Sequence, residues 1–389
     1  MKFKRVFLLI LDSLGVGEAQ DANDYGDVGA NTLGHLVEKY DLFVPNLKKL
    51  GFLDTVKMTE NQDSDAYYTI AKPTNIGKDS LTGHYEIMGI KSVTPFKVYT
   101  ERAFPRELLE KIEAVTGKRV IGNKVTSGQQ IIDELGERHL SYKSLIIYTS
   151  RDSTLQVAAH EDIIPIPKLY EYCEKIRKIT LSDEWRIARV IARPFTGKVG
   201  KFKFTQDRRD YSVAPPSKSV MDYLKEKDYS VISIGKINDI FNGQGITKKV
   251  KSSYDNMDSL NKLTDIMEKK FSGLCVANLS DFDTLYGHTK DPEGYARGIE
   301  EFDVEIPMIL NKLENDDLLI ITADHGNDPT MPGNSHTREN VPVIVFSRLF
   351  KNPGKMDILD SPSDIAATIA DNFNVEMPSI GKSFLDKLK

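Results

Sequence analysis

Acidic and histidine side chains follow apolar runs at several separate places in this sequence of 389 residues. Asp12 comes directly after the apolar run Val6–Leu11. Asp324 and His325 follow another such run, and His336 stands in the polar loop that comes next. Carboxylate and imidazole ligands without thiolate suit manganese or zinc. These residue types therefore indicate a metal centre.

One further segment adds ligands of the same kind, because Asp283 precedes His288 by five positions after an apolar run. An acid and an imidazole at this spacing could close around one cation. Six ligands are too many for one tetrahedral ion but divide into two sets of three, as in sites that keep a position open for substrate. Two divalent cations about 3.5–4 Å apart can clamp the attacking and leaving oxygens of a phosphoryl transfer. The six candidates are Asp12, Asp283, His288, Asp324, His325 and His336.

A candidate nucleophile lies in the glycine-bounded segment 77–86, where either Ser80 or Thr82 could serve. A serine hydroxyl is a weak nucleophile near neutral pH, so it needs a base or a metal to activate it. Two cations would do this without a catalytic triad. The alternative interpretation is structural, with Ser80 and Glu86 at an ordinary capped helix start.

The elements that must position these side chains are predicted strands. Apolar runs without polar alternation are typical of parallel strands that are covered on both faces. Open α/β sheets collect their ligands beyond the carboxyl ends of such strands. Segments with helical spacing lie between the runs, so the sequence predicts an α/β fold. The runs are Val6–Leu11, Tyr229–Ile234, Leu274–Leu279, Leu318–Thr322 and Val341–Phe346.

The middle third of the chain has a different pattern of predicted strands and helices, and Pro215-Pro216 interrupts regular structure where this part ends. We expect a core domain formed by residues 1–95 and 213–389, with a mostly parallel sheet flanked by helices, and an inserted α+β cap domain over 96–212. The cap is predicted to begin with a helix that starts at Phe104-Pro105 and stops at Gly117. It should also contain three strands and a second helix, which are Ser144–Thr149, Leu155–Ala159, Trp185–Ala192 and Lys168–Thr180.

Composition narrows the class of protein further. Hydrophobic residues make up 40% and charged residues 28%, which is the balance of a folded globular chain. With 52 basic and 57 acidic residues the net charge is −5, so we expect no nucleic-acid partner.

The two distant cysteines, Cys173 and Cys275, form no motif and fit a reducing cytoplasm. The run Val6–Leu11 is too short for a signal segment or a membrane span, so no membrane association is expected.

Together the motifs resemble the metal core of the alkaline phosphatase superfamily and, within it, the phosphopentomutase family. The resemblance extends along nearly the whole chain. The motifs that carry it are Asp12-Ser13, Lys78-Asp79-Ser80, Asp281-Phe282-Asp283, Asp324-His325-Gly326-Asn327 and His336-Thr337-Arg338.

The resemblance implies a division of the ligands between two manganese ions. One ion would be held by Asp12, Asp324 and His325. The other would be held by Asp283, His288 and His336. Ser80 would touch both ions and carry the phosphoryl group, although bacterial relatives commonly have threonine at this position. Thr82 remains the second choice as nucleophile.

The resemblance also implies a sugar-phosphate site built mainly by the cap. A strand would place Arg189, Ile191 and Arg193 on one side, where a guanidinium can hold a phosphate with two hydrogen bonds. Phe204 stands where the family pattern has a basic residue, and Lys203 or Arg208 could substitute for it. The expected substrate-binding residues are Ser150, Asp152, Arg189, Arg193 and Lys236.

The implied activity is the interconversion of ribose or deoxyribose 1-phosphate with the 5-phosphate, as in nucleoside salvage. It would proceed through a phosphoserine and a pentose 1,5-bisphosphate, with glucose 1,6-bisphosphate or a similar compound as activator and Lys78 adding positive charge. The alternatives are a metal-dependent phosphatase or a phosphoglycerate mutase on the same core, and a catalytically silent binding protein. Sugar phosphates are the expected small-molecule partners, and the oligomeric state is left open, with a monomer allowed.

Overall fold

The computed structural model describes residues 2–99, 103–150, 153–251, 255–333 and 335–389. Its residues divide into two compact units. The larger unit contains residues 1–94 and 215–389, and the inserted unit contains residues 95–214.

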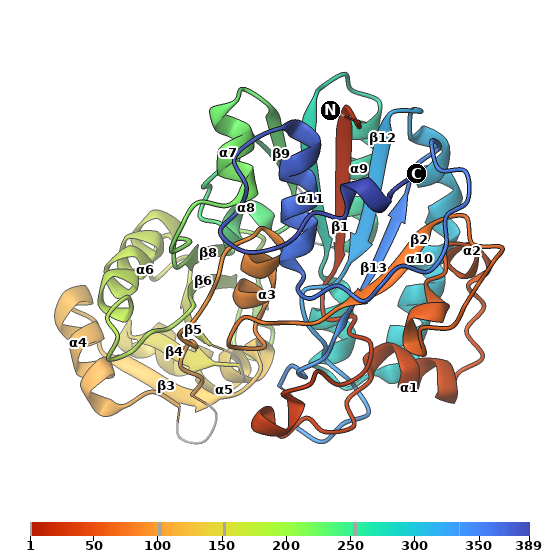
Figure 1. Cartoon of the computed structure of the whole chain (residues 1–389). Helices are drawn as coiled ribbons and strands as arrows, with labels where there is room; N and C mark the ends of the chain where they lie inside the picture. Colours follow the sequence, from red (N-terminus) through yellow and green to blue (C-terminus); the bar gives the residue numbers. More distant parts are fainter. Residues whose placement is uncertain (1, 100–102, 151–152, 252–254, 334) are drawn as a thin grey trace. The chain divides into compact units, whose positions relative to one another are not determined.

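The larger unit is built on a seven-stranded sheet with the strand order β10-β9-β11-β1-β12-β13-β2 (Figure 1). Strand β1 is buried along its whole length and lies between β11 and β12, both parallel to it. The expected α/β fold with a mostly parallel sheet is confirmed. The strands are β1 (Arg5–Leu11), β2 (Tyr67–Ala71), β9 (Ser230–Ile234), β10 (Lys248–Val250), β11 (Gly273–Leu279), β12 (Asp317–Thr322) and β13 (Val341–Phe346).

The register of the three central strands explains where the site forms. Leu11 pairs with Leu279, and Ile10 pairs with Thr322, so β1, β11 and β12 end side by side. The residues that follow these strands therefore emerge at one edge of the sheet. This alignment brings segments that are hundreds of residues apart in the sequence to one place.

Helices cover both faces of this sheet, as its uninterrupted apolar strands require. Helices α7 and α11 pack against each other on one face, and α9 and α10 pack against each other on the other (Figure 1). No helix in the described part of the chain is both long and apolar enough to cross a membrane. The helices are α1 (Thr32–Lys39), α2 (Pro45–Lys49), α3 (Ser80–Ile87), α7 (Val220–Glu226), α8 (Ile237–Ile240), α9 (Asn256–Met267), α10 (Pro292–Lys312) and α11 (Ser363–Phe373).

Two strands depart from the parallel arrangement. Strand β13 runs antiparallel to β12, and β2, which the sequence did not predict, pairs antiparallel with β13 at the edge of the sheet. The segment Tyr67–Ala71 is only five residues long and partly exposed, so it gave no apolar run to recognise. Short turns of 3-10 helix at 22–25, 53–56 and 385–387 and a π-helical turn at 282–287 complete this unit.

The inserted unit has a six-stranded sheet with the order β3-β4-β5-β6-β7, and β8 also pairs with β6. Helices α4 and α6 pack together on one side of its apolar core. The other side is packed by α5. The elements are α4 (Arg106–Thr116), β3 (Val120–Val125), α5 (Gly128–Tyr142), β4 (Leu145–Thr149), β5 (Thr154–His160), α6 (Ile166–Thr180), β6 (Arg189–Thr196), β7 (Lys203–Phe204) and β8 (Arg209–Ser212).

The strand expected at Trp185–Ala192 was placed wrongly, because β6 spans Arg189–Thr196. The amide groups of Trp185 and Arg186 both donate to the carbonyl of Ser182, and Arg186 has a φ of 37°. This turn occupies the start of the predicted strand. The strand then continues through Pro194, where we had expected it to be over.

Candidate metal centre

Three buried carboxylates meet at the strand ends of the larger unit. Asp12 follows β1 and accepts a hydrogen bond from the amide of Asn278 at 2.9 Å through Oδ2. Asp324 follows β12 and accepts from the backbone N–H of Ser13 at 2.9 Å through Oδ1. Asp283 lies in the π-helical turn 282–287 after β11, a type of turn that is frequent at functional sites. The structure thus brings together the three aspartates that the sequence singled out.

The three predicted histidines surround these carboxylates. His288 Nε2 is 3.3 Å from Asp283 Oδ2, and His336 Nε2 is 3.4 Å from Asp283 Oδ1. The Nε2 atoms of His288 and His336 are 3.2 Å apart. His325 Nε2 is 3.2 Å from Asp324 Oδ2, and its ring stacks on that of His336 with centroids 3.9 Å apart.

These side chains fit bound cations. Asp12 Oδ1 and Asp324 Oδ2 are buried and find no hydrogen-bond donor among the described residues. A buried polar atom left in this state costs about 1–3 kcal/mol or more, so a positive ligand is expected to satisfy it. Two groups have donor atoms that all lie within 4.8 Å of one another, and they are Asp12 with His84 and Asp324, and Asp283 with His325 and His336.

Burial and neighbouring charges shift the pKa values of the acidic and histidine side chains of this site. Burial, followed by the charge of Asp324, raises the pKa of Asp12 to about 7. Burial also favours the neutral form of Asp283, but His288 and His336 outweigh it and hold the pKa of Asp283 well below its usual range. Burial disfavours charged His325, yet Asp324 raises the pKa of His325 to about 10. A metal ion bound to His325 would displace the proton that this imidazole carries.

Ser80 is the first residue of α3, and its Oγ is 3.1 Å from His325 Nε2. The interpretation of Ser80 as a helix N-cap is wrong, because the cap is Asp79, whose side chain accepts from the backbone N–H of Thr82. Thr82 donates its own hydroxyl to Asp79 at 2.6 Å. Glu86 takes no part in the cap and instead binds the segment 74–75. Of the two candidate hydroxyls, that of Ser80 is the one in direct contact with His325.

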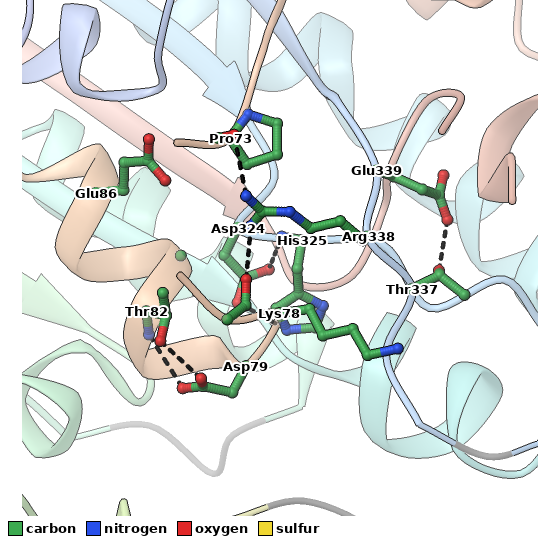
Figure 2. A pocket seen from close by; sticks show the side chains of 12 residues that line it. Pro73, Lys78, Asp79, Thr82, Glu86, Asp324, His325, Thr337, Arg338 and Glu339 are labelled. Atoms are coloured by element: carbon green, nitrogen blue, oxygen red, sulfur yellow. Dashed lines mark hydrogen bonds and ion pairs between the residues drawn. The ribbon is translucent and has the colours of Figure 1, made fainter. Parts of the chain in front are cut away.

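An arginine holds the segment that carries Ser80. Arg338 is buried, with two hydrogen bonds of 2.9 Å to Asp21, and it donates to the carbonyl groups of Gly77 at 2.6 Å and Pro73 at 3.1 Å. Figure 2 shows this side chain beside a small cavity that Lys78, Asp79, Asp324 and His325 also line.

Two more contacts tie the same segment to the metal loop. Lys78, expected to add charge, forms an ion pair of 2.6 Å with Asp27. The carbonyl group of Lys78 lies 2.8 Å from His336 Nδ1. The loop of His336 and the segment of Ser80 are therefore held together.

Lys236 was expected to bind substrate, and the structure places it beside Asp12. It follows β9, its backbone N–H donates to the amide oxygen of Asn278 at 2.7 Å, and its Nζ is 3.9 Å from Asp12 Oδ2. Its ammonium group therefore lies at the same strand edge as the acidic residues.

In the inserted unit, the arginines of β6 share one face, as expected from strand alternation. Arg189, Ile191 and Arg193 pair in register with Thr154, Gln156 and Ala158 of β5. In the same unit, Arg208 forms two hydrogen bonds with Asp210, of 2.8 and 2.9 Å. Arg189 Nη1 lies 3.5 Å from the same carboxylate.

Arg193 differs from its neighbours. Its guanidinium carbon lies 4.2 Å from the centroid of the Phe204 ring. Within the described residues it has no hydrogen-bonded carboxylate, and burial lowers the pKa of Arg193. Phe204, found where a basic residue was expected, thus serves as a flat support for Arg193.

The remaining expected substrate residues are Ser150 and Asp152. Ser150 follows β4, and its hydroxyl accepts from the amide of Gln156 at 2.9 Å and lies 3.1 Å from the hydroxyl of Thr154. Asp152 lies outside the described residues. The roles of Ser150, Asp152 and Arg189 stay predictions.

His84 is the residue at the centre that analysis of the sequence missed. It lies four positions after Ser80 on α3, is fully buried, and its Nδ1 is 3.1 Å from Asp324 Oδ2. The signal in the sequence was one helical turn between the nucleophile candidate and a histidine.

Several solved structures are similar to this chain. A phosphoglycerate mutase from Leishmania mexicana, solved at low cobalt concentration, is 13% identical with a TM-score of 0.50, and the match covers 98% of this chain and 97% of that one. The PH0037 protein of Pyrococcus horikoshii is 14% identical with a TM-score of 0.49, covering 96% and 98%. An alkaline phosphatase superfamily protein from Vibrio parahaemolyticus is 14% identical with a TM-score of 0.47, covering 99% and 70%. At these identities the likeness concerns the fold.

A sequence profile settles the family. The profile of the metalloenzyme superfamily matches residues 4–377, which is nearly the whole chain and includes every residue of the candidate centre. The alkaline-phosphatase-like fold and the two acidic-histidine groups agree with this match. The chain belongs to the metalloenzyme superfamily.

Proposed function

We propose that this chain is a phosphopentomutase, with Ser80 as the residue that carries the phosphoryl group. The observation on which this depends is the position of Ser80 Oγ, 3.1 Å from His325 Nε2 and next to two groups of metal-type ligands. Two manganese ions would be held by Asp12, Asp324 and His325 and by Asp283, His288 and His336. When bound, such ions supply Lewis acidity that activates a hydroxyl and neutralises phosphoryl oxygens.

Ser80 alone can carry the phosphoryl group in both transfers of this reaction. Phospho-Ser80 transfers its phosphoryl group to the 5-hydroxyl of ribose 1-phosphate, while the proton of that hydroxyl passes to Ser80 Oγ. Ser80 then takes the phosphoryl group from position 1 of the bisphosphate and returns a proton to the sugar oxygen. The product is ribose 5-phosphate, and the enzyme is again phosphorylated. Glucose 1,6-bisphosphate or a similar bisphosphate would load Ser80 at the start.

The positively charged side chains support a phosphate ester as substrate. Arg193 presents a guanidinium without a carboxylate partner in the described part of the chain, and guanidinium groups bind phosphate with paired hydrogen bonds. We propose Arg193 as the main phosphate ligand of the inserted unit, with Ser150, Asp152 and Arg189 as further substrate residues. Lys236 would act at the metal centre, beside Asp12.

A metal-dependent phosphatase and a phosphoglycerate mutase are the alternatives. A phosphatase results if water reaches phospho-Ser80 before a sugar hydroxyl does. The likeness to the phosphoglycerate mutase is one of fold at 13% identity and carries no substrate to this chain.

A coupled assay separates these alternatives. The protein with manganese and glucose 1,6-bisphosphate should convert ribose 1-phosphate to ribose 5-phosphate, release little inorganic phosphate and leave 3-phosphoglycerate unchanged. Release of phosphate in proportion to consumed substrate would identify a phosphatase. Conversion of 3-phosphoglycerate, with none of the pentose phosphates, would identify a phosphoglycerate mutase.

A further inference from the structure

His84 presents a free ring nitrogen to the acidic edge of the sheet. Its Nδ1 is 2.8 Å from the carbonyl oxygen of Ser80, so the N–H of the ring points to that carbonyl. In this tautomer Nε2 carries a lone pair and is an acceptor. Nε2 is buried and has no hydrogen-bond partner among the residues that the structure describes.

Two carboxylate oxygens lie close to the His84 ring, Asp12 Oδ1 beside Nε2 and Asp324 Oδ2 beside Nδ1, and the three residues offer ligand atoms that lie within 4.8 Å of one another. Asp12 Oδ1 is 3.8 Å from His84 Nε2, and like Asp324 Oδ2 it lacks a hydrogen-bond donor in the described structure. The imidazoles of His84 and His325 lie 3.1 and 3.2 Å from Asp324 Oδ2. Unpaired acceptors buried together are costly, because each has lost its contact with water. A cation among them would satisfy all three.

Two other histidines of the candidate centre are oriented in the same way as His84. His325 and His336 also turn Nδ1 to a backbone carbonyl, at 3.0 and 2.8 Å, and present Nε2 to the acidic residues. Metal-binding histidines commonly have this arrangement, because the second hydrogen bond fixes the ring and its tautomer. His139 and His160 of the inserted unit differ, since both nitrogens of each ring contact backbone groups. His84 thus resembles the histidines of the centre.

The close approach of α3 to β12 depends on a glycine. A Cβ atom on Gly83 would lie 2.1 Å from the carbonyl oxygen of Asp324, so no larger residue fits there. The absence of a side chain lets the helix touch the backbone of Asp324. This contact carries His84 to the carboxylates.

We propose that His84 is a ligand of the first metal ion and binds it through Nε2, together with Asp12 and Asp324. His84 would join the ligands that the resemblance implies for this ion. The inference concerns metal binding, so it does not depend on which phosphate ester is the substrate.

Titration of the full-length chain with Mn²⁺ tests the proposal. We expect the unaltered protein to bind two ions, and His84→Gln to bind one of them about tenfold or more weakly while the other is unchanged. His35→Ala is the matched control, because His35 is on the same unit, is partly exposed and contacts Asp328 and Thr330 away from both groups. Retention of both ions at their original affinity by His84→Gln would overturn the proposal.

A second measurement guards against a variant that does not fold. The Mn²⁺-loaded unaltered protein should be crystallised and the ions located from their anomalous scattering. We expect one ion bonded to His84 Nε2, Asp12 and Asp324. An ion bonded to the two aspartates, with His84 Nε2 out of bonding range, would make His84 a residue that only positions Ser80 and Asp324. If the metal results hold and pentose phosphates are not converted, the proposed function alone is wrong.

Discussion

In the larger unit, the buried carboxylates of Asp12 and Asp324 each have an oxygen that no hydrogen-bond donor among the described residues satisfies. In the inserted unit the imbalance has the opposite sign, because Arg193 lies on the ring of Phe204 without a hydrogen-bonded carboxylate in the described structure. The carboxylates of the larger unit can therefore accept a positive partner, and the guanidinium of Arg193 in the inserted unit can accept a negative one. A divalent cation suits the first and a phosphate group suits the second. The two imbalances together favour a metal-dependent enzyme for phosphate esters.

Removal of the hydroxyl between the acidic groups should have the largest effect on activity. Ser80→Ala is expected to lower the rate of transfer at least about a thousandfold, because the phosphoryl group loses its carrier, while both metal ions stay bound. Mass spectrometry should find no phosphoserine. Thr82→Ala is the matched control, since it loses the hydrogen bond to Asp79 and should cost about 1 kcal/mol of stability but keep the phosphoserine. Phosphate on Thr82 in either protein would reverse the assignment.

The two regions should also respond differently to pH. The pKa of Asp12, raised to about 7 by burial and by Asp324, means that this carboxyl is protonated below pH 7 before metal binds. Metal must displace that proton and also the proton of His325, whose pKa is raised to about 10, so Mn²⁺ affinity at this ion should fall about a hundredfold per pH unit below pH 7. Arg193 stays charged over this range, so phosphate binding by Arg193 should change only through the ionisation of the phosphate group itself. Metal titration at several pH values checks the slope, and a flat profile would contradict it.

Loss of the unpaired guanidinium should affect substrate binding and leave the metal centre intact. Arg193→Gln is expected to raise the KM for ribose 5-phosphate about tenfold to a hundredfold, the range for a lost hydrogen bond to a charged group. Its Mn²⁺ affinity should equal that of the unaltered protein. Arg189→Gln provides the comparison, because Arg189 is already close to Asp210 and should have the smaller effect. Equal effects of the two substitutions would remove the distinction between these arginines.

The smallest effect on KM is expected from substitution of Phe204, whose ring supports Arg193. Phe204→Leu should raise the same KM about threefold to tenfold, because a cation–π contact contributes about 0.5–1 kcal/mol or somewhat more when shielded from water. Phe204→Tyr should restore the value, since it keeps the ring. An unchanged KM in Phe204→Leu, with Arg193→Gln still impaired, would show that Arg193 needs no aromatic support.

Much of the larger unit followed from its sequence. The apolar runs predicted β1, β9, β11, β12 and β13 to within a residue at each end, because strands buried on both faces leave a continuous hydrophobic signal. The edge strand β2 gave no such signal, and the turn at Trp185 and Arg186 concealed the true start of β6. Local conformation at these places depends on hydrogen bonds that residue type alone does not specify.

Analysis of the sequence also identified most of the centre, because aspartates and histidines that follow buried strands can be recognised one segment at a time. The sequence alone therefore determined the types of candidate ligand, the segments that carry them and the candidate hydroxyl beside them. Only the tertiary structure decided that His84 faces Asp12, that Arg338 binds the segment of Ser80, and that Arg189 and Arg208 share Asp210 while Arg193 does not. Those contacts join residues from separate elements, and their distances depend on the register of the sheet and the packing of α3 on β12.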